Sequence, residues 1–291
     1  SGANWSWKTA MGGSLAAPTT ILHFFSPSPS PNAGEPKAYL KNINMTTTRT
    51  ILVTGASGGI GSALCSQLSA AGHTVIAASR ELDRLTETDA THKIAGDCTS
   101  EAGAVALLEA ASEAAGGTPF GLAHCLGNTL LTPLHRTRAN AWTETMRVNL
   151  DSSFYLLHAW INRRLSEKSG GSAVFASSVV ARIGVANHEA IAAAKGGLEA
   201  LVRSAAATYA AQSLRFNLVA PGLTDTPLTA PLLKSDAFRA AATKQYPLHG
   251  LQSADDVASA MAWLLSDQSS RITGQVIPVD GGFTSVRPLV K

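Results

Sequence analysis

The sequence has little of several residue types, and each shortage argues against a class of protein. Its three cysteines, Cys65, Cys98 and Cys125, form no CxxC pair, so neither a disulfide framework nor a zinc site is indicated. Charged residues make up 15% of the chain and the net charge of +3 is unclustered, which argues against a nucleic-acid surface. Apolar runs fall well short of the roughly 20 residues that a membrane-spanning helix needs. We therefore expect a small-molecule partner, a reducing compartment such as the cytoplasm, no membrane span and no metal.

The first 44 of the 291 residues differ in composition from the rest. A short apolar patch, ILHFF, is followed by SPSPSPNAGEP, which cannot propagate a helix or strand. Residues 1–44 are interpreted as an N-terminal extension, and Met45 as a natural start for the remainder of the chain. The extension is a tail, a tag remnant or, since it is poor in acidic residues, a remnant of an organelle-targeting segment.

From residue 50 onwards, short apolar runs alternate with alanine-rich helical stretches. This order predicts a parallel sheet with helices on both faces, in one doubly wound α/β domain over residues 45–291. The expected strands lie in 49–55, 73–80, 121–127, 171–178 and 214–222. The expected helices lie in 62–72, 104–117, 142–164 and 190–211.

The stretch TGASGGIG, residues 54–61, lies between the first predicted strand and the first predicted helix. Glycines at this place allow a tight turn and let the backbone approach a pyrophosphate at a helix N-terminus. A lone glycine motif is weak evidence and could be an ordinary turn. Its position between a strand and a helix makes a dinucleotide site the better interpretation.

This spacing resembles the short-chain dehydrogenase/reductase family, and further matches run from Thr50 to Thr284. The matching motifs are AGDCTS, RVNLDSSF, the strand end AVFASS, NLVAPGLTDT and ITGQVIPVDGG. The resemblance implies a Rossmann fold with a dinucleotide bound by Thr54, Gly55, Ser57, Gly58, Gly59, Ile60, Gly61, Ser79, Arg80, Asp97, Cys98, Leu126, Gly127, Lys195, Pro221, Gly222, Leu223, Thr224 and Thr226. It also implies a homo-oligomer packed through two long helices.

The end of the second predicted strand indicates which dinucleotide is bound. An acidic residue there would hydrogen-bond the ribose hydroxyls of NAD, but this chain has Ser79 and Arg80. A hydroxyl and a guanidinium can hold a 2′-phosphate, which a carboxylate would repel. NADP is therefore the expected cofactor and NAD the less favoured one. The alternative is that Arg80 stacks on adenine or points to solvent.

The chain departs from the family at the centre of its active site. In the family a serine, a tyrosine, a lysine and an asparagine surround the reacting oxygen, and Ser178, Lys195 and Asn149 match three of them. Four residues before Lys195, where the tyrosine is expected, the chain has Ile191, which has no proton to give. The family motif NNAG also appears here as HCLG, residues 124–127, whose first residues we expect to pack at a strand end.

Helix geometry offers His188 as a substitute for the tyrosine. It lies seven residues before Lys195, about two turns away on the same helix face. The enoyl-acyl-carrier-protein reductases, a divergent branch of the family, place their tyrosine at this longer spacing. We expect Asn187 to cap the helix and His188 to act as a neutral hydrogen-bond donor. The alternative is that His188 is a polar cap or an oligomer contact.

Two functions are compatible with these residues. The first is an NADP-dependent oxidoreductase acting on a small carbonyl or alcohol, or on an activated double bond, with Asn149, Ser178, His188 and Lys195 as its catalytic residues. The second is an inactive NADP-binding sensor, scaffold or assembly subunit, which the loss of the tyrosine would permit. The retention of Asn149, Ser178 and Lys195 favours the enzyme.

Overall fold

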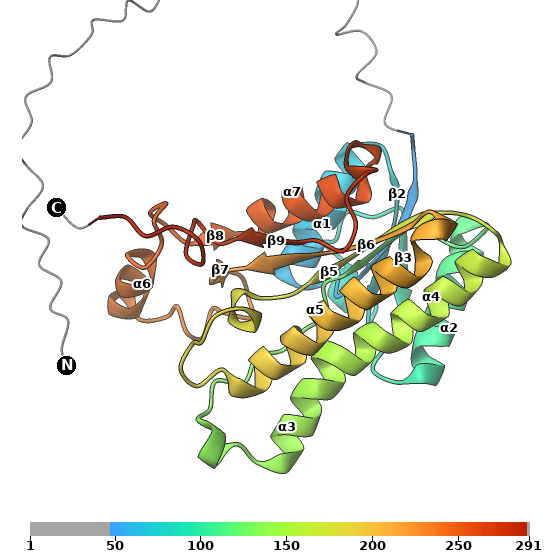
Figure 1. Ribbon diagram of the computed structural model, residues 1–291. Helices are drawn as coiled ribbons and strands as arrows, with labels where there is room; N and C mark the ends of the chain where they lie inside the picture. The colour runs from blue at the N-terminus through green and yellow to red at the C-terminus, as the bar shows by residue number, and fades with distance from the viewer. Residues whose placement is uncertain (1–46, 290–291) are drawn as a thin grey trace, which may run out of the picture. The chain divides into compact units, whose positions relative to one another are not determined.

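The structure is a computed structural model that describes residues 47–289. Seven parallel strands form a sheet in the order β3-β2-β1-β4-β5-β6-β9 (Figure 1). They are β1 (Thr50–Thr54), β2 (Thr74–Ser79), β3 (His92–Ala95), β4 (Gly121–His124), β5 (Gly171–Ala176), β6 (Leu214–Pro221) and β9 (Val276–Val279). The predicted doubly wound parallel sheet is confirmed. The predicted extension over residues 1–44 lies outside the described residues, so the expected domain boundary stays a prediction.

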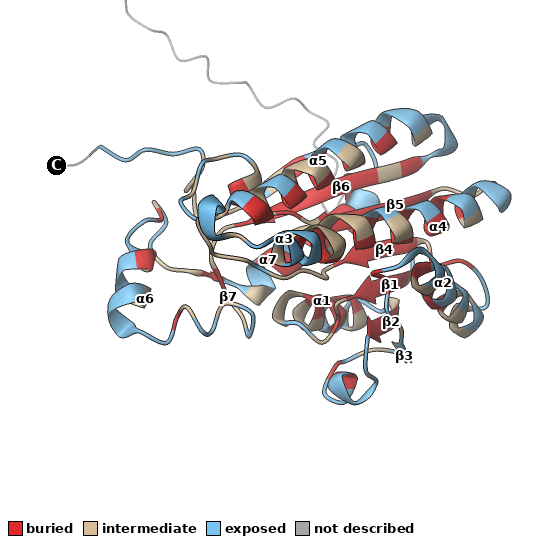
Figure 2. Cartoon of the chain, turned by 90° about the horizontal axis from the view of Figure 1, so that it is seen from below, coloured by how far each residue is buried: buried red, intermediate tan, exposed pale blue. Residues whose placement is uncertain are grey.

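Helices cover both faces of the sheet (Figure 1). One face packs against α1 (Gly59–Ala70) and α7 (Ala254–Leu265), and the other against α2 (Glu101–Ala115), α4 (Ser152–Ser166) and α5 (Glu189–Tyr209). Successive strand residues point to opposite faces, so that Leu52 joins one core and Val53 the other. The strands are buried while the outer helix faces are exposed (Figure 2). In the part of the chain that the structure describes, no helix is both long and apolar enough to cross a membrane.

Two details of the predicted elements were wrong. The helix expected over residues 142–164 is α3 (Ala139–Met146) followed by a π-helical turn (Arg147–Asp151) and then α4. The strands β3 and β9 were not predicted from the sequence. Both are short strands at the edges of the sheet, where one-sided pairing and partial burial leave only a weak hydrophobic pattern.

The order of the strands determines where a ligand can bind. The connections run in opposite directions on either side of β1 and β4, and such a switch point opens a crevice at the carboxyl ends of the strands. Three further elements follow β6: β7 (Thr224–Asp225), α6 (Asp236–Thr243) and β8 (Gln252–Ser253). Together with the strand ends, residues of this later segment line one cavity.

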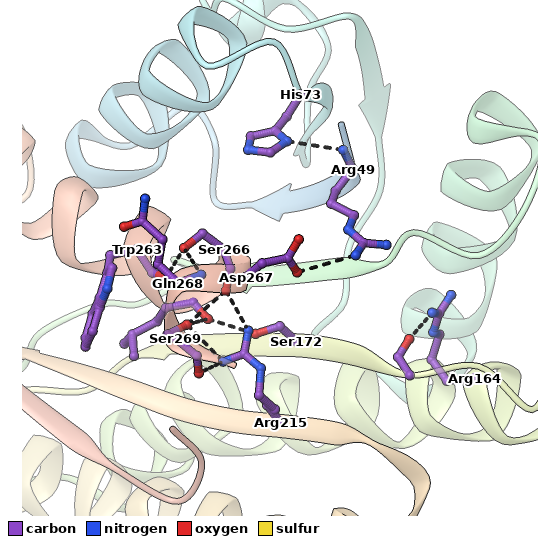
Figure 3. Close-up of polar contacts among 12 residues, drawn as sticks. Arg49, His73, Arg164, Ser172, Arg215, Trp263, Ser266, Asp267, Gln268 and Ser269 are labelled. Atoms are coloured by element: carbon purple, nitrogen blue, oxygen red, sulfur yellow. Dashed lines mark hydrogen bonds and ion pairs between the residues drawn. The ribbon is translucent and has the colours of Figure 1, made fainter. Parts of the chain in front are cut away.

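The half-buried Arg215 on β6 fixes the loop between α7 and β9 (Figure 3). Its Nη1 donates to the carbonyl of Ser269 at 2.9 Å and to that of Ile272 at 3.3 Å. Its Nη2 donates to the carbonyl of Ser266 at 3.1 Å. A single guanidinium therefore donates to three loop carbonyls, each of which also accepts from at least one further donor in the chain.

We expect Arg215→Met to lower the free energy of unfolding by about 1–3 kcal/mol, because the hydrogen bonds from the guanidinium to three loop carbonyls are lost. Urea titration measures the change. Arg163→Met is the matched control, since Arg163 makes only an exposed ion pair with Glu109 at 3.4 Å. The control should change stability by about 0.5 kcal/mol or less. Equal losses in the two variants would contradict the role given to Arg215.

Candidate active site

In the loop between β1 and α1, glycines leave the backbone uncovered by side chains. Gly55 has a φ of +68°, and a Cβ there would lie 2.7 Å from the amide nitrogen of Leu126. A Cβ on Gly61 would lie 2.3 Å from the carbonyl oxygen of Gly55. Helix α1 begins at Gly59 without a side-chain cap and without an acidic residue in its first turn, so its free amide groups can receive an anion. These residues fit the pyrophosphate of a dinucleotide.

The residues predicted to hold the adenosine half of the cofactor lie at the ends of β2 and β3. The buried Ser79 forms a hydrogen bond of 3.1 Å with Ser57, while Arg80 is exposed. The exposed Asp97 accepts from the amide of Thr99 at 2.9 Å. The raising effect of burial on the pKa of Asp97 is outweighed by these Thr99 hydrogen bonds and by the charges of Arg147 and Arg80, so its pKa is lowered. The charge of Arg80 therefore acts on Asp97, another residue predicted to bind the dinucleotide.

Lys195 projects from α5 into the centre of the site. Its Nζ donates to the carbonyl of Ala176, at the end of β5, at 2.8 Å. Burial lowers the pKa of Lys195 to about 8. A Cβ on Gly127 would lie 3.6 Å from this Nζ, so the glycine keeps the space in front of the ammonium group open. An anionic or hydroxyl-bearing ligand placed here would supply the solvation that the buried ammonium group lacks.

Asn149 is held in the π-helical turn that separates α3 from α4. Its Nδ2 donates to Asn128 Oδ1 at 2.6 Å and to the carbonyl of Thr145 at 2.9 Å, and its Oδ1 accepts from the amide of Asn128 at 3.3 Å. Both amide hydrogens have an acceptor, so the side chain fixes the turn that follows Gly127. Single π-helical turns of this kind are frequent at functional sites. Asn128 had no recognisable signal in the sequence.

Ser178 begins the 3-10 turn Val179–Ala181 that follows β5. Its Oγ accepts from the amide of Val180 at 3.4 Å, which leaves the hydroxyl hydrogen available for another acceptor. The neighbouring Ser177 donates to the buried carboxylate of Glu199 at 2.9 Å. Glu199 also pairs with Arg182 at 3.1 Å. This buried contact ties the end of β5 to α5, and Glu199 had no recognisable signal in the sequence.

Ile191 occupies the place of the missing tyrosine with an apolar side chain. It is 5% exposed and forms a small cluster with Val179 and Val180, on which Phe283 packs. The position therefore supplies no proton donor and instead forms an apolar wall of the cavity. The chemistry expected of the tyrosine requires another side chain.

His188 is the cap residue of α5, not a residue of its first turn. Asn187 has a φ of +66° in the left-handed region, and α5 begins at Glu189, so the prediction that Asn187 caps the helix was wrong. The His188 Nδ1 lies 2.7 Å from the carbonyl oxygen of Ala186. Since a carbonyl only accepts, Nδ1 carries the hydrogen, and in the neutral ring Nε2 is an acceptor. The expectation of a neutral donor is thereby corrected, because its one hydrogen is already used.

The side chains expected around the reacting oxygen lie on one cavity of 440 Å³. Ser178, His188, Lys195 and Asn149 all line it, together with cofactor-site residues predicted from the sequence: Ile60, Leu126, Gly127, Pro221, Gly222, Leu223, Thr224 and Thr226. Tyr246, which no sequence motif indicated, also lines it and accepts from the amide of Leu223 at 2.7 Å. The cavity thus joins the predicted cofactor site to the predicted catalytic residues.

His124 is a buried link between the cofactor loop and the π-helical turn. Its ring lies 2.7 Å from Thr54 Oγ1 through Nδ1 and 3.0 Å from Ser152 Oγ through Nε2. Ser152 donates its hydrogen to the carbonyl of Val148, so it accepts from Nε2, and Nδ1 accepts from Thr54. The expected strand-end packing of His124 is thus a directed chain of hydrogen bonds. Within residues 47–289, no group of three His, Cys, Asp or Glu side chains could hold a metal ion.

Two cysteines near the predicted cofactor site are free thiols. Burial raises the pKa of Cys125 far above its usual range. Burial, and to a smaller extent the charge of Asp97, raises the pKa of Cys98 to about 12. Both side chains therefore act as small apolar groups rather than as nucleophiles.

The stability of the protein should depend on His124 in acid. Burial, and to a lesser degree the charge of Lys195, lowers the pKa of His124 from 6.5 to about 3. The unfolded chain takes up a proton as the pH falls through 6.5 while the folded chain does not, so folding stability is lost between pH 6.5 and pH 3. The loss should reach up to roughly 4 kcal/mol.

His124→Asn should reduce stability at pH 7 and flatten this acid dependence. Chemical denaturation at a series of pH values measures both effects. The control is His158→Asn, on the exposed face of α4, which should leave the slope unchanged. An acid dependence that is the same in His124→Asn and in the unmodified protein would contradict the buried neutral imidazole.

Comparison with known proteins agrees with this geometry. Residues 55–284 match the family model described as "Enoyl-(Acyl carrier protein) reductase". The chain is 35% identical over 245 residues to cis-4-hydroxycyclohexanecarboxylate dehydrogenase of Sinomonas cyclohexanicum, covering 82% of this chain and 97% of the relative. It is 32% identical over 245 residues to 3beta-hydroxysteroid dehydrogenase 1 of Eggerthella lenta, covering 81% and 94%.

A solved structure also resembles the fold. The ligand-free aldohexose dehydrogenase of Thermoplasma acidophilum superimposes with a TM-score of 0.77 at 27% identity, covering 84% of this chain and 97% of that one. The strand order, the bare glycine loop and the matched family model lead to one conclusion. The chain belongs to the short-chain dehydrogenase/reductase family, whose members are oxidoreductases that bind a nicotinamide dinucleotide.

Proposed function

We propose that this protein is an NADP-dependent oxidoreductase that interconverts a secondary alcohol and its ketone, with His188 in place of the missing tyrosine. The observation that carries the proposal is the His188 hydrogen bond to Ala186, which leaves Nε2 free as a proton acceptor on the cavity that Ser178 also lines. Bound NADP would supply the acceptor or donor of the hydride. The chain's own residues then have to bind the substrate oxygen and move its proton.

Ser178 and His188 share these two tasks. The free hydroxyl hydrogen of Ser178 can donate to the substrate oxygen, and the Nε2 of His188 can accept the proton of an alcohol. Once protonated, the imidazolium keeps its Nδ1 hydrogen on the carbonyl of Ala186, which stabilises the added charge. In the opposite direction the imidazolium returns the proton to the oxygen of a ketone. Asn149 would fix the backbone next to this oxygen, and Lys195 would bind the ribose of the cofactor.

Several observations support NADP over NAD. Arg80 is exposed beside Ser79, and no ion pair with an acidic residue engages it among residues 47–289. Ser57 and Ser79 add two hydroxyl groups at the same strand ends. A 2′-phosphate would find a cation and two hydrogen-bonding groups there, and no carboxylate replaces them at the end of β2.

Arg80→Ala should weaken NADPH binding by about 10-fold to 100-fold, because a charge-assisted hydrogen bond is lost. NADH affinity should change by about 2-fold or less, since NADH lacks the phosphate that the guanidinium would bind. Fluorescence titration measures both dissociation constants. The control is Arg84→Ala, an exposed arginine in the turn after β2. Parallel losses for both nucleotides would argue against a 2′-phosphate contact.

His188→Gln should lower kcat/KM for alcohol oxidation by about 100-fold or more, because an amide cannot take up the proton. NADPH affinity should remain as it was. Absorbance at 340 nm with a panel of secondary alcohols measures the rate, and His135→Gln, an exposed residue outside the cavity, is the control. Turnover that is unchanged in His188→Gln would show that another group moves the proton.

The second candidate is a cofactor-binding protein without turnover. The specific observation in its favour is the apolar cluster around Ile191, which removes the family's proton donor from the site. A protein that binds NADPH but oxidises no alcohol, with or without the His188→Gln substitution, would support it.

For either function we propose a homo-oligomer, in which the outer faces of α4 and α5 pack against a second copy. Phe154 on α4 is 48% exposed and offers an apolar contact there.

A further inference from the structure

The wall of the cavity carries almost no charge. Among its described lining residues only His188 and Lys195 have side chains that can be cationic, and none is acidic. Lys195 is buried, donates to the carbonyl of Ala176 and lies behind Gly127, on the side of the predicted cofactor site. With His188 in its neutral form, a negatively charged substrate body would therefore have no counter-ion of its own in the substrate part of the cavity.

The two arginines on segments that border the cavity are engaged elsewhere. Arg182, which follows the 3-10 turn after β5, pairs with Glu199 at 3.1 Å. Arg239 on α6 pairs with Asp225 at 2.6 Å. Neither arginine lines the cavity, and the exposed Lys234 and Lys244 on the segment after β6 do not line it either. A carboxylate or phosphate that entered would lose its hydration without gaining a paired cation, which is costly.

Apolar side chains line the cavity from two sides. The Ile191 cluster, with Val179 and Val180, forms one wall. On the segment after β6, Leu228 is 52% exposed and Phe238 is 47% exposed, although both line the cavity. A ligand that covered these two side chains would remove apolar surface from water and gain free energy in proportion to the area covered.

The space left for the substrate is limited. The cavity measures 440 Å³, and the residues that line it include Ile60, Gly127 and Gly222 of the predicted cofactor site, so the cofactor takes part of this volume. The polar lining residues nearest in sequence to Gly127 are the uncharged Asn128 and Thr129. The remaining space suits one compact ring or a branched chain with a single oxygen to be bound.

We propose that the substrate is an uncharged alcohol or ketone whose body is a compact hydrocarbon ring or branched chain, and that the site discriminates against carboxylates and phosphates. This inference rests on the proposed function, since it concerns the same site. It sets the chain apart from the relative named for cis-4-hydroxycyclohexanecarboxylate, a substrate that carries a carboxylate.

The test compares two ketones that differ by one charge. The protein is saturated with NADP+, which cannot reduce a ketone, and titrated with methyl 4-oxocyclohexanecarboxylate or with 4-oxocyclohexanecarboxylate. Calorimetry gives both dissociation constants without turnover. The ester should bind at least about 30-fold more tightly than the acid, because the carboxylate is desolvated without a partner.

A positive charge on the wall of the cavity should weaken the preference for the ester over the acid. Phe238→Arg places a cation beside the cavity and should reduce the ratio of the two dissociation constants by about 10-fold. Leu134→Arg, at an apolar residue that is 60% exposed and outside the cavity, is the control and should leave the ratio unchanged. Binding of the acid as tight as that of the ester, or binding of neither ketone to a protein that holds NADP+, would overturn the inference.

The proposed function is tested separately by adding NADPH and the ester. Binding of the ester without its reduction would leave the substrate-site selectivity in place and argue against the proposed reaction. Reduction of the acid in preference to the ester would support the reaction and overturn the selectivity.

Discussion

The close approach of the backbone at the carboxyl ends of β1 and β4 determines the rest of the site. Gly55 and Leu126 are so near that the glycine could not carry a side chain, and Gly61 lies against Gly55 in the same way. His124, directly before this contact, bonds Thr54 on one side and Ser152 on the other. The bare loop, β4 and the π-helical turn are therefore joined by backbone contact and hydrogen bonds, and Asn149 lies in the part of the turn that they fix.

Helix α5 supplies the second set of constraints. Its residues Lys195 and Ile191 and its cap residue His188 all reach the same cavity, one helical turn after another. The buried ammonium group of Lys195 has a single carbonyl partner, which makes this end of the cavity suited to the polar part of a ligand. The Ile191 cluster makes the next part apolar. In the proposed function, the reacting oxygen would therefore be bound by Ser178 and by the free nitrogen of His188.

Local sequence patterns predicted the features that depend on neighbours in the chain. The loop of residues 54–61, the end of β5 with Ser178 and the spacing to Lys195 each lie within one strand, turn or helix, so their residue types carry the signal. The partners of these residues could not be predicted in the same way. Tyr246 meets Leu223 across 23 positions, and Glu199 meets Ser177 across 22, with no periodicity that joins them.

The direction of the His188 hydrogen bond depended on a backbone conformation that the sequence only permits. Asn187 adopts the left-handed region, which asparagine tolerates better than most residues, and this turns the histidine back towards Ala186. A helix-cap preference favoured Asn187 instead, because asparagine is among the best residues at that place. Two preferences of one side chain competed here, and the tertiary structure decided between them.

Transfer of hydrogen from a labelled alcohol tests the central claim most directly. The protein would be mixed in excess with NADP+ and cyclohexanol deuterated at the carbinol carbon, and the recovered cofactor examined by mass spectrometry. The account predicts reduced cofactor that contains one deuterium, formed by the unmodified protein and strongly diminished in His188→Gln. A protein that binds NADP+ but yields no deuterated cofactor would contradict the claim that this tyrosine-free site carries out alcohol oxidation.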